Sequence, residues 1–141
     1  MATAVDKDAL YIAYEDVRSD LSKTMWALFK YEGTRIIHDS SGEDLSDVAL
    51  KLTDDDRAFI FVRVATGDEM SKRTKFVFLT WIGPNVSPLK RARVSTDKAL
   101  VKQIVQNFAV ELQLETADDI TTDYLQKEVK KAGGANYGTG V

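Results

Sequence analysis

The sequence predicts an α/β (α+β) fold, a single domain with a central mixed sheet of five to six strands and helices on both faces. Helix-type and strand-type hydrophobic spacings alternate along the chain, and two neighbouring runs are apolar almost throughout. The 141 residues contain no repeat and no obvious linker. A chain of this size buries roughly two thirds of its unfolded surface, so one hydrophobic core is expected.

The first elements are a helix and a hairpin. Residues 8–23, DALYIAYEDVRSDLSK, space their apolar side chains three and four apart, as an amphipathic helix does. The predicted inward positions are Leu10, Ala13, Tyr14, Val17 and Leu21. Residues 24–31 and 34–39 then change to β-favouring residues, and Gly33 supplies the turn of a predicted hairpin.

A short helix and two strong strands follow. Residues 43–52, EDLSDVALKL, suit a short helix that TDDD ends with turn-forming residues. Residues 57–65 and 75–82, RAFIFVRVA and KFVFLTWI, are dense in β-branched and aromatic side chains. Their nearly continuous apolar character predicts central strands covered on both faces. The segment TGDEMSKRT between them is long enough for an open hairpin loop.

A long helix is predicted to begin at Ser87 and Pro88, because serine caps free backbone amides and proline is tolerated at the first helical position. A straight helix would place Lys90 in the middle of the later apolar face. A buried unpaired lysine is too costly, so a break or kink is expected near Ser95 and Thr96. The apolar face comprises Leu100, Val101, Ile104, Val105 and Phe108.

The end of the chain predicts a strand, a helix and a tail. VELQLE is the expected strand, and TTDYLQKEVKKA is the expected final helix. Its inward residues are Ile120, Tyr124, Leu125 and Val129. The glycines of GGANYGTGV are expected to end this helix. We therefore predict a domain over residues 1–132 and a flexible C-terminal tail over 133–141.

Composition excludes several classes of site. The chain has no cysteine, so disulfides, thiolate nucleophiles and zinc–thiolate sites are excluded and an oxidising compartment is not required. The N-terminus lacks a basic segment followed by an apolar one, and no apolar run approaches the ~18 residues of a membrane span. A cytoplasmic protein without membrane insertion is expected.

Positive charge is concentrated in one window. Residues 71–102 carry a net charge of +7, whereas the rest of the chain carries −10 and the whole chain −3. The molecule is therefore expected to be electrically two-sided unless folding intermingles the segments. Solvation alone explains single lysines, but this clustering favours binding to a large acidic surface.

Catalytic and metal-binding patterns find little support. His38 is the only histidine, and its neighbouring candidate nucleophiles are Ser40 and Ser41, so a structural or solvent-exposed role is favoured. The acidic run of residues 54–56 lacks the spacing of a calcium loop. No glycine-rich phosphate motif is present, and Trp26 and Trp81 lie in apolar runs that favour the core over base stacking. We expect no enzyme, no cofactor, no metal and no nucleic-acid partner.

The residues FKYEG, SKRTKFVFLTWIG, STDKALVKQIVQNFA and KKAGGANY closely resemble the coactosin branch of the actin-depolymerising factor homology (ADF-H, cofilin) family. The likeness runs from the first helix to the tail. It implies a single ADF-H domain that binds the side of actin filaments (F-actin) without an enzymatic step. It also implies a monomeric protein of the cytoskeleton.

The resemblance implies two contact regions, the long helix with its preceding loop, and the loop between the central strands with the last helix. Lys75, which opens KFVFLTWIG, is the expected filament contact, with Lys72 and Arg73 in support. The full set of expected actin-binding residues is Lys72, Arg73, Lys75, Lys90, Arg91, Arg93, Lys98, Lys102, Lys130 and Lys131.

The head of the long helix departs from the depolymerising members of the family. Those members carry a basic stretch with a methionine and a tyrosine, whereas this chain reads PLKRARV. The departure argues against strong severing or depolymerisation, and it fits interference with barbed-end capping. The alternative function is a cytoplasmic scaffold that binds another protein or anionic phosphoinositide headgroups through the same cations, with Lys127, Lys130 and Lys131 contributing.

Overall fold

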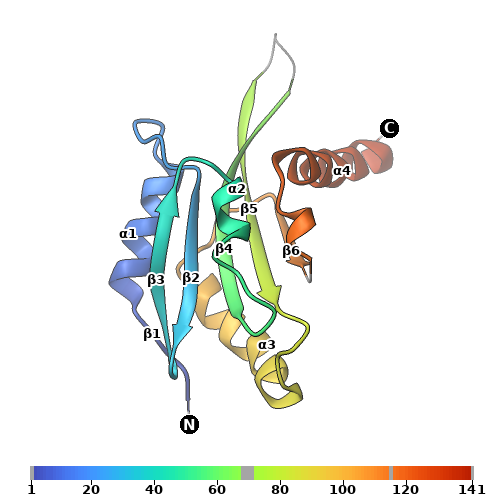
Figure 1. The fold of residues 1–141 in the computed structure, drawn as a ribbon. Helices are drawn as coiled ribbons and strands as arrows, with labels where there is room; N and C mark the ends of the chain where they lie inside the picture. Colours follow the sequence, from blue (N-terminus) through green and yellow to red (C-terminus); the bar gives the residue numbers. More distant parts are fainter. Residues whose placement is uncertain (1, 68–71, 115, 141) are drawn as a thin grey trace.

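The computed structural model describes residues 2–67, 72–114 and 116–140, with the backbone alone for residues 134–140. Within this part of the chain, six strands form one mixed sheet in the order β1-β3-β2-β4-β5-β6 (Figure 1). The pairs β1–β3 and β5–β6 are parallel, and the others are antiparallel. The strands are β1 Ala4–Val5, β2 Trp26–Glu32, β3 Arg35–Gly42, β4 Arg57–Thr66, β5 Arg73–Ile82 and β6 Val110–Leu114.

Helices cover both faces of the sheet, as predicted. Residues of α1 and α3 pack in one hydrophobic layer, and residues that include α2 and α4 pack in the other. The bounds are α1 Lys7–Arg18, α2 Ser46–Ala49, α3 Pro88–Lys102 and α4 Thr122–Gly140, with a single 3₁₀ turn at Ala117–Asp119. The predicted α+β architecture is therefore confirmed.

Aromatic side chains fill the sheet between these layers. The rings of Phe59 and Phe78 stack under α1 and α3 with centroids 5.9 Å apart. On the other face Trp26 and Trp81 are buried, and their indole N–H groups donate to the carbonyls of Asp44 at 2.8 Å and Thr53 at 3.0 Å. The prediction that both tryptophans belong to the core is confirmed.

The antiparallel pair β4–β5 forms the long central hairpin. Its register runs from Arg57 opposite Ile82 at one end to Thr66 opposite Arg73 at the other. At about 3.3 Å per residue the ten residues of β5 span about 30 Å. Residues 68–71 of the predicted hairpin loop lie outside the described residues.

The prediction for the first helix is wrong at Leu21. Leu10, Ala13, Tyr14 and Val17 are buried as expected, but the Leu21 side chain is 98% exposed. The cause is that α1 ends at Arg18, where Ser19 takes an extended backbone conformation. The helical spacing that placed Leu21 inward therefore no longer applies.

The predicted kink in the long helix is also wrong. The Ser87 hydroxyl accepts from the Lys90 amide and Pro88 opens the helix, as predicted, but α3 then continues without a break to Lys102. Ser95 and Thr96 lie inside it. Lys90 needs no kink to escape burial, because the first turn of α3 lies beyond the end of β5 (Figure 1) and Lys90 is exposed. The apolar face reaches the core at Val101 near the end of the helix and continues through Ile104, Val105 and Phe108 after it.

The last helix packs as predicted at three of four positions. Ile120, Leu125 and Val129 are buried, and Tyr124 is half-buried. The helical backbone of α4 continues to Gly140, beyond the glycine pair at which we expected it to end. Glycine disfavours a helix interior by only about 1 kcal/mol per residue, which neighbouring turns can offset. The mobility of residues 133–141 stays a prediction.

Candidate functional site

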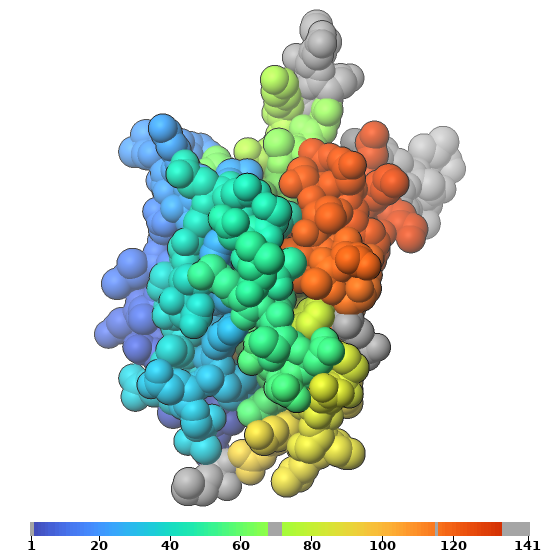
Figure 2. Space-filling model, viewed as in Figure 1, coloured from blue at the N-terminus to red at the C-terminus, as the bar shows by residue number. Residues whose placement is uncertain are grey.

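Basic side chains gather where the β4–β5 hairpin lies beside α4. Alternation along β5 places Lys75 on the same sheet face as Val77 and Leu79, which pack in the core layer that includes α4 residues. Lys72 and Arg73 are exposed just before it. We name this region the hairpin surface, defined as Lys72, Arg73, Lys75, Lys127 and Lys130. Figure 2 shows α4 in orange next to the green base of the hairpin.

The contact between α4 and the hairpin is direct. The Gln126 side-chain amide donates to the Ala65 carbonyl at 2.8 Å. The groove between the two elements has a volume of about 140 Å³, and Lys127 and Lys130 line it with Thr66. Lys130 follows Gln126 by one helical turn, so both lie on the flank that faces the hairpin.

Lys131 lies elsewhere on α4. Its ammonium group pairs with the Glu128 carboxylate at 3.5 Å, and its side chain is 79% exposed. Lys130 and Lys131 both belong to the expected actin-binding set. The structure divides them, because adjacent residues on a helix point about 100° apart.

A second basic surface lies at the start of α3. We name it the α3 head, defined as Leu89, Lys90, Arg91 and Arg93. Leu89 is 75% exposed, and the basic side chains surround it along the first two turns. The Arg91 guanidinium donates to the Gly83 carbonyl at 3.2 Å, which fastens the helix to the loop before it.

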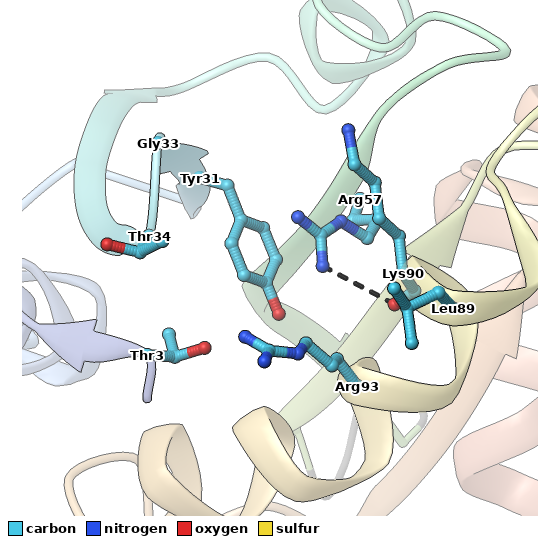
Figure 3. A pocket seen from close by; sticks show the side chains of 8 residues that line it. All are labelled: Thr3, Tyr31, Gly33, Thr34, Arg57, Leu89, Lys90 and Arg93. Carbon is cyan, nitrogen blue, oxygen red and sulfur yellow. Dashed lines mark hydrogen bonds between the residues drawn. The ribbon is translucent and has the colours of Figure 1, made fainter. Parts of the chain in front are cut away.

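A pocket of about 250 Å³ opens beside the α3 head (Figure 3). Lys90 and Arg93 line it from α3, while Tyr31 comes from β2 and Arg57 from β4. The Arg57 guanidinium carbon lies 3.8 Å from the centroid of the Tyr31 ring, and one of its nitrogens donates to the Lys90 carbonyl at 3.3 Å. Three elements that are distant in sequence therefore meet at this pocket.

Tyr31 is also tied to the middle of α3. Its hydroxyl donates to the Asp97 carboxylate at 2.6 Å, and Asp97 is 3% exposed. Burial, and after it the hydrogen bond to Asp97, raise the pKa of Tyr31 far above its usual value, so Tyr31 keeps its proton and remains a donor. No local sequence pattern signals this contact, because the two residues are 66 positions apart. Leu89 was also not predicted as a site residue. Its signal in the sequence is a large apolar side chain in the first turn of a basic helix.

The lysines near the end of α3 are engaged within the fold. The ammonium groups of Lys98 and Lys102 lie 2.8 Å and 2.6 Å from the two carboxylate oxygens of Glu111 in β6. Burial alone would raise the pKa of Glu111, but hydrogen bonds from Lys102 and Lys98 outweigh it and lower that pKa. These two lysines therefore form a partly neutralised cluster between α3 and β6.

The cations of residues 71–102 fall into two groups in the structure. The resemblance implied two contact regions, one at the long helix and one at the loop between the central strands with the last helix. The structure places the hairpin surface and the α3 head at opposite ends of β5, about 30 Å apart. Arg91, Lys98 and Lys102, which belong to the expected actin-binding set, bind other parts of the fold through their side chains.

The minor candidates have ordinary structural roles. His38 Nε2 lies 2.7 Å from the Ser41 hydroxyl oxygen in β3, and its ring contacts Phe29 edge-on. The acidic run at 54–56 belongs to a turn in which the Asp56 carboxylate accepts from the Thr53 amide at 2.8 Å. Among the described residues no cluster of histidine and carboxylate ligands could hold a metal ion. In the same part of the chain no helix is long and apolar enough to cross a membrane.

Comparison with known proteins identifies the family. The family described as cofilin/tropomyosin-type actin-binding protein matches residues 2–130. The chain belongs to this actin-binding family. Human coactosin-like protein is 50% identical over 137 residues, which cover 97% of this chain and 96% of that protein. Coactosin of Dictyostelium discoideum is 40% identical over 136 residues, with 94% and 93% of the two chains covered.

Solved structures of cofilin-family members agree with this assignment. A crystal structure of human coactosin-like protein superposes with a TM-score of 0.88 at 47% identity, covering 92% of this chain and 99% of that one. The solution structure of mouse coactosin, described as an actin filament binding protein, gives 0.81 at 48% identity over 99% and 98% of the chains. The ADF-H fold and the resemblance to coactosins are therefore both confirmed.

Proposed function

We propose that this protein binds the sides of actin filaments as coactosins are expected to do, without an enzymatic step. In this proposal it neither severs nor depolymerises filaments strongly, and it counteracts capping at the barbed end. Membership of an actin-binding family supports actin as the partner. A location in the cytoplasm, at the cytoskeleton, follows from that partner.

The observation that carries the proposal is the open hairpin surface. Among the residues that the structure describes, no carboxylate lies within ion-pair distance of Lys75, and the side chain points to the α4 face of the sheet. Lys72 and Arg73 before it are exposed. Lys98 and Lys102 differ from these cations, because both already bind Glu111.

Charge alone does not supply enough binding energy. A micromolar complex requires about −8 kcal/mol, whereas one exposed ion pair contributes only about 0 to 1 kcal/mol. The α3 head offers a complementary apolar contact, because Leu89 is 75% exposed between basic side chains. We infer that the α3 head supplies apolar contact area, while the hairpin surface sets orientation and the rate of association.

The decisive experiment is co-sedimentation of the purified protein with actin filaments at low and physiological salt. Lys75→Ala should weaken binding by up to about fivefold, because it removes a charge that contributes about 0 to 1 kcal/mol in the contact region. Lys51→Ala is the matched control, since Lys51 is exposed near α2 and belongs to neither basic surface. Equal pelleting of wild type and Lys75→Ala would move the site to α3 or α4. If the wild type does not pellet at all, filament binding is refuted and the scaffold alternative takes its place.

The finer activities need separate assays. The PLKRARV head of α3 lacks the methionine and tyrosine of depolymerising members, so the protein should leave the length of filaments unchanged in a microscopy assay. In an elongation assay with a barbed-end capping protein, it should restore growth. Rapid shortening of filaments, or growth that stays fully capped, would contradict these parts of the proposal.

A further inference from the structure

The first turn of α3 has little of the core beneath it. Leu89 and Lys90 are exposed, and the first buried side chain of the helix is that of Val94. A helix end with few apolar contacts frays readily. The orientation of the α3 head must therefore be set by contacts other than core packing.

One such contact comes from Arg57 on β4. The central carbon of its guanidinium lies 3.8 Å from the centroid of the Tyr31 ring, and one of its nitrogens donates to the Lys90 carbonyl at 3.3 Å. A planar guanidinium can stack on an aromatic face and still donate hydrogen bonds in its own plane. Arg57 thus joins the ring of Tyr31 to the first turn of α3.

The second contact comes from the hydroxyl of the same tyrosine. It donates to the Asp97 carboxylate at 2.6 Å, and that carboxylate is buried. Asp97 follows Lys90 by seven residues, about two turns or roughly 10 Å along the helix axis. Tyr31 therefore holds α3 at two separate levels, through Arg57 at Lys90 and directly at Asp97. Figure 3 shows the Arg57 guanidinium beside the ring and the Arg93 guanidinium near the hydroxyl end of Tyr31.

We propose that Tyr31 is a positioning residue, which with Arg57 fixes the α3 head in the orientation that a filament contact requires. The inference rests on the proposed function and adds a role for two residues outside the basic window. Two fixed levels along a helix define its direction, whereas one would leave it free to tilt. Because the pKa of Tyr31 is raised by burial and by Asp97, the hydroxyl keeps its proton at neutral pH.

A matched control exists on the same strand. Arg63 lies on the same face of β4 as Arg57, six residues further along, and also donates to a backbone carbonyl, that of Ser19 at 2.8 Å. Its contact ties down the segment after α1 and touches no part of α3. Arg57→Gln and Arg63→Gln each remove one charge and one hydrogen bond to a backbone carbonyl. Arg63→Gln also removes an ion pair with the exposed Asp20, but only Arg57→Gln releases the α3 head.

The test combines hydrogen–deuterium exchange with filament co-sedimentation for Arg57→Gln, Arg63→Gln and Tyr31→Phe. In Arg57→Gln and Tyr31→Phe, the amides of residues 91–97 should exchange about 3- to 10-fold faster than in wild type, because the contacts that suppress opening are lost. Filament affinity should fall by a similar factor of about 3 to 10. Arg63→Gln should leave the exchange of residues 91–97 and the filament affinity unchanged, even if this variant unfolds at a lower temperature.

The salt dependence of binding separates positioning from direct contact. Tyr31→Phe removes no charge, so its affinity should fall equally at low and physiological salt. Wild-type exchange of residues 91–97 in Tyr31→Phe would overturn the proposal, as would an equal loss of binding in Arg63→Gln. Failure of the wild type itself to pellet would instead overturn the proposed function. The wild type therefore tests the proposed function, and the variants test the positioning role of Tyr31.

Discussion

The hairpin surface and the α3 head are both basic, yet they are built in different ways. Lys75 owes its position to strand alternation, and Lys130 to its place on the flank of α4 that faces the hairpin. The α3 head instead contacts Arg57 of β4, which donates to the Lys90 carbonyl and lies over the ring of Tyr31 of β2. Cations from one basic window of the sequence therefore belong to separate surfaces, because a strand of about 30 Å lies between them.

The largest expected effect tests whether both ends contact the filament. Lys75→Ala removes one positive charge from the hairpin surface, and Lys90→Ala removes one from the α3 head. Sites this far apart should contribute independently to binding. If each variant weakens binding by about fivefold, the double variant should weaken it by about 25-fold. Co-sedimentation over a range of actin concentrations measures this. A double variant no weaker than Lys75→Ala alone would show that the α3 head does not take part.

A smaller effect separates apolar contact from charge. Leu89→Ala should weaken filament binding by about 3- to 10-fold, because an apolar anchor loses its contact area, and the loss should persist at high salt. The free energy of unfolding should change by less than about 0.5 kcal/mol, since the side chain is 75% exposed. Leu50→Ala, at a leucine that is 84% exposed near α2, is the control and should bind normally. A defect that disappears at high salt would contradict the apolar role.

The Glu111 cluster predicts a pH dependence of stability. The pKa of Glu111 in the folded state is lowered from its usual 4.5. Burial would raise this pKa, but the hydrogen bonds from Lys102 and Lys98 lower it by more. A lowered pKa stabilises the fold above that usual value, and the stabilisation is lost as pH falls through the lowered pKa. Glu111→Gln should therefore lose about 1 kcal/mol at pH 7 and depend less on pH in acid.

Urea unfolding at neutral and acidic pH measures this difference. Glu43→Gln, at an exposed carboxylate after β3, is the control and should behave as wild type at both pH values. Wild-type stability of Glu111→Gln at neutral pH would mean that the cluster contributes nothing to folding. The two lysines would then be available to a partner after all.

The smallest expected effect concerns Lys102. Its ammonium group binds Glu111 and lies 5.6 Å from the centroid of the Phe108 ring. Lys102→Ala should lower the free energy of unfolding by about 0.5 to 1 kcal/mol and change filament affinity by less than about twofold. Binding is measured by co-sedimentation and stability by urea unfolding. A loss of affinity as large as that of Lys90→Ala would return Lys102 to the contact surface.

The sequence by itself determined the layers and most of the elements of this protein, whereas β1 and its parallel pairing with β3 were not predicted. Strand alternation, helical spacing and the cap at Ser87 are local properties, so the hairpins, the central strands and the start of α3 were predictable. The errors at Leu21 and at the expected kink arose where a periodic pattern continued beyond the end of its element. Periodicity records which side chains share a face, but not where the supporting sheet stops.

Only the tertiary structure decided which cations are available and which are held. Glu111 joins β6 to α3, Asp97 meets a tyrosine 66 positions away, and Lys130 and Lys131 lie on different flanks of one helix. These pairings depend on the order of the strands and on the crossover from β5 through α3 to β6, which a local charge count does not contain. Coulombic and hydrogen-bond energies depend on distances in space, and those distances are set by the packed fold.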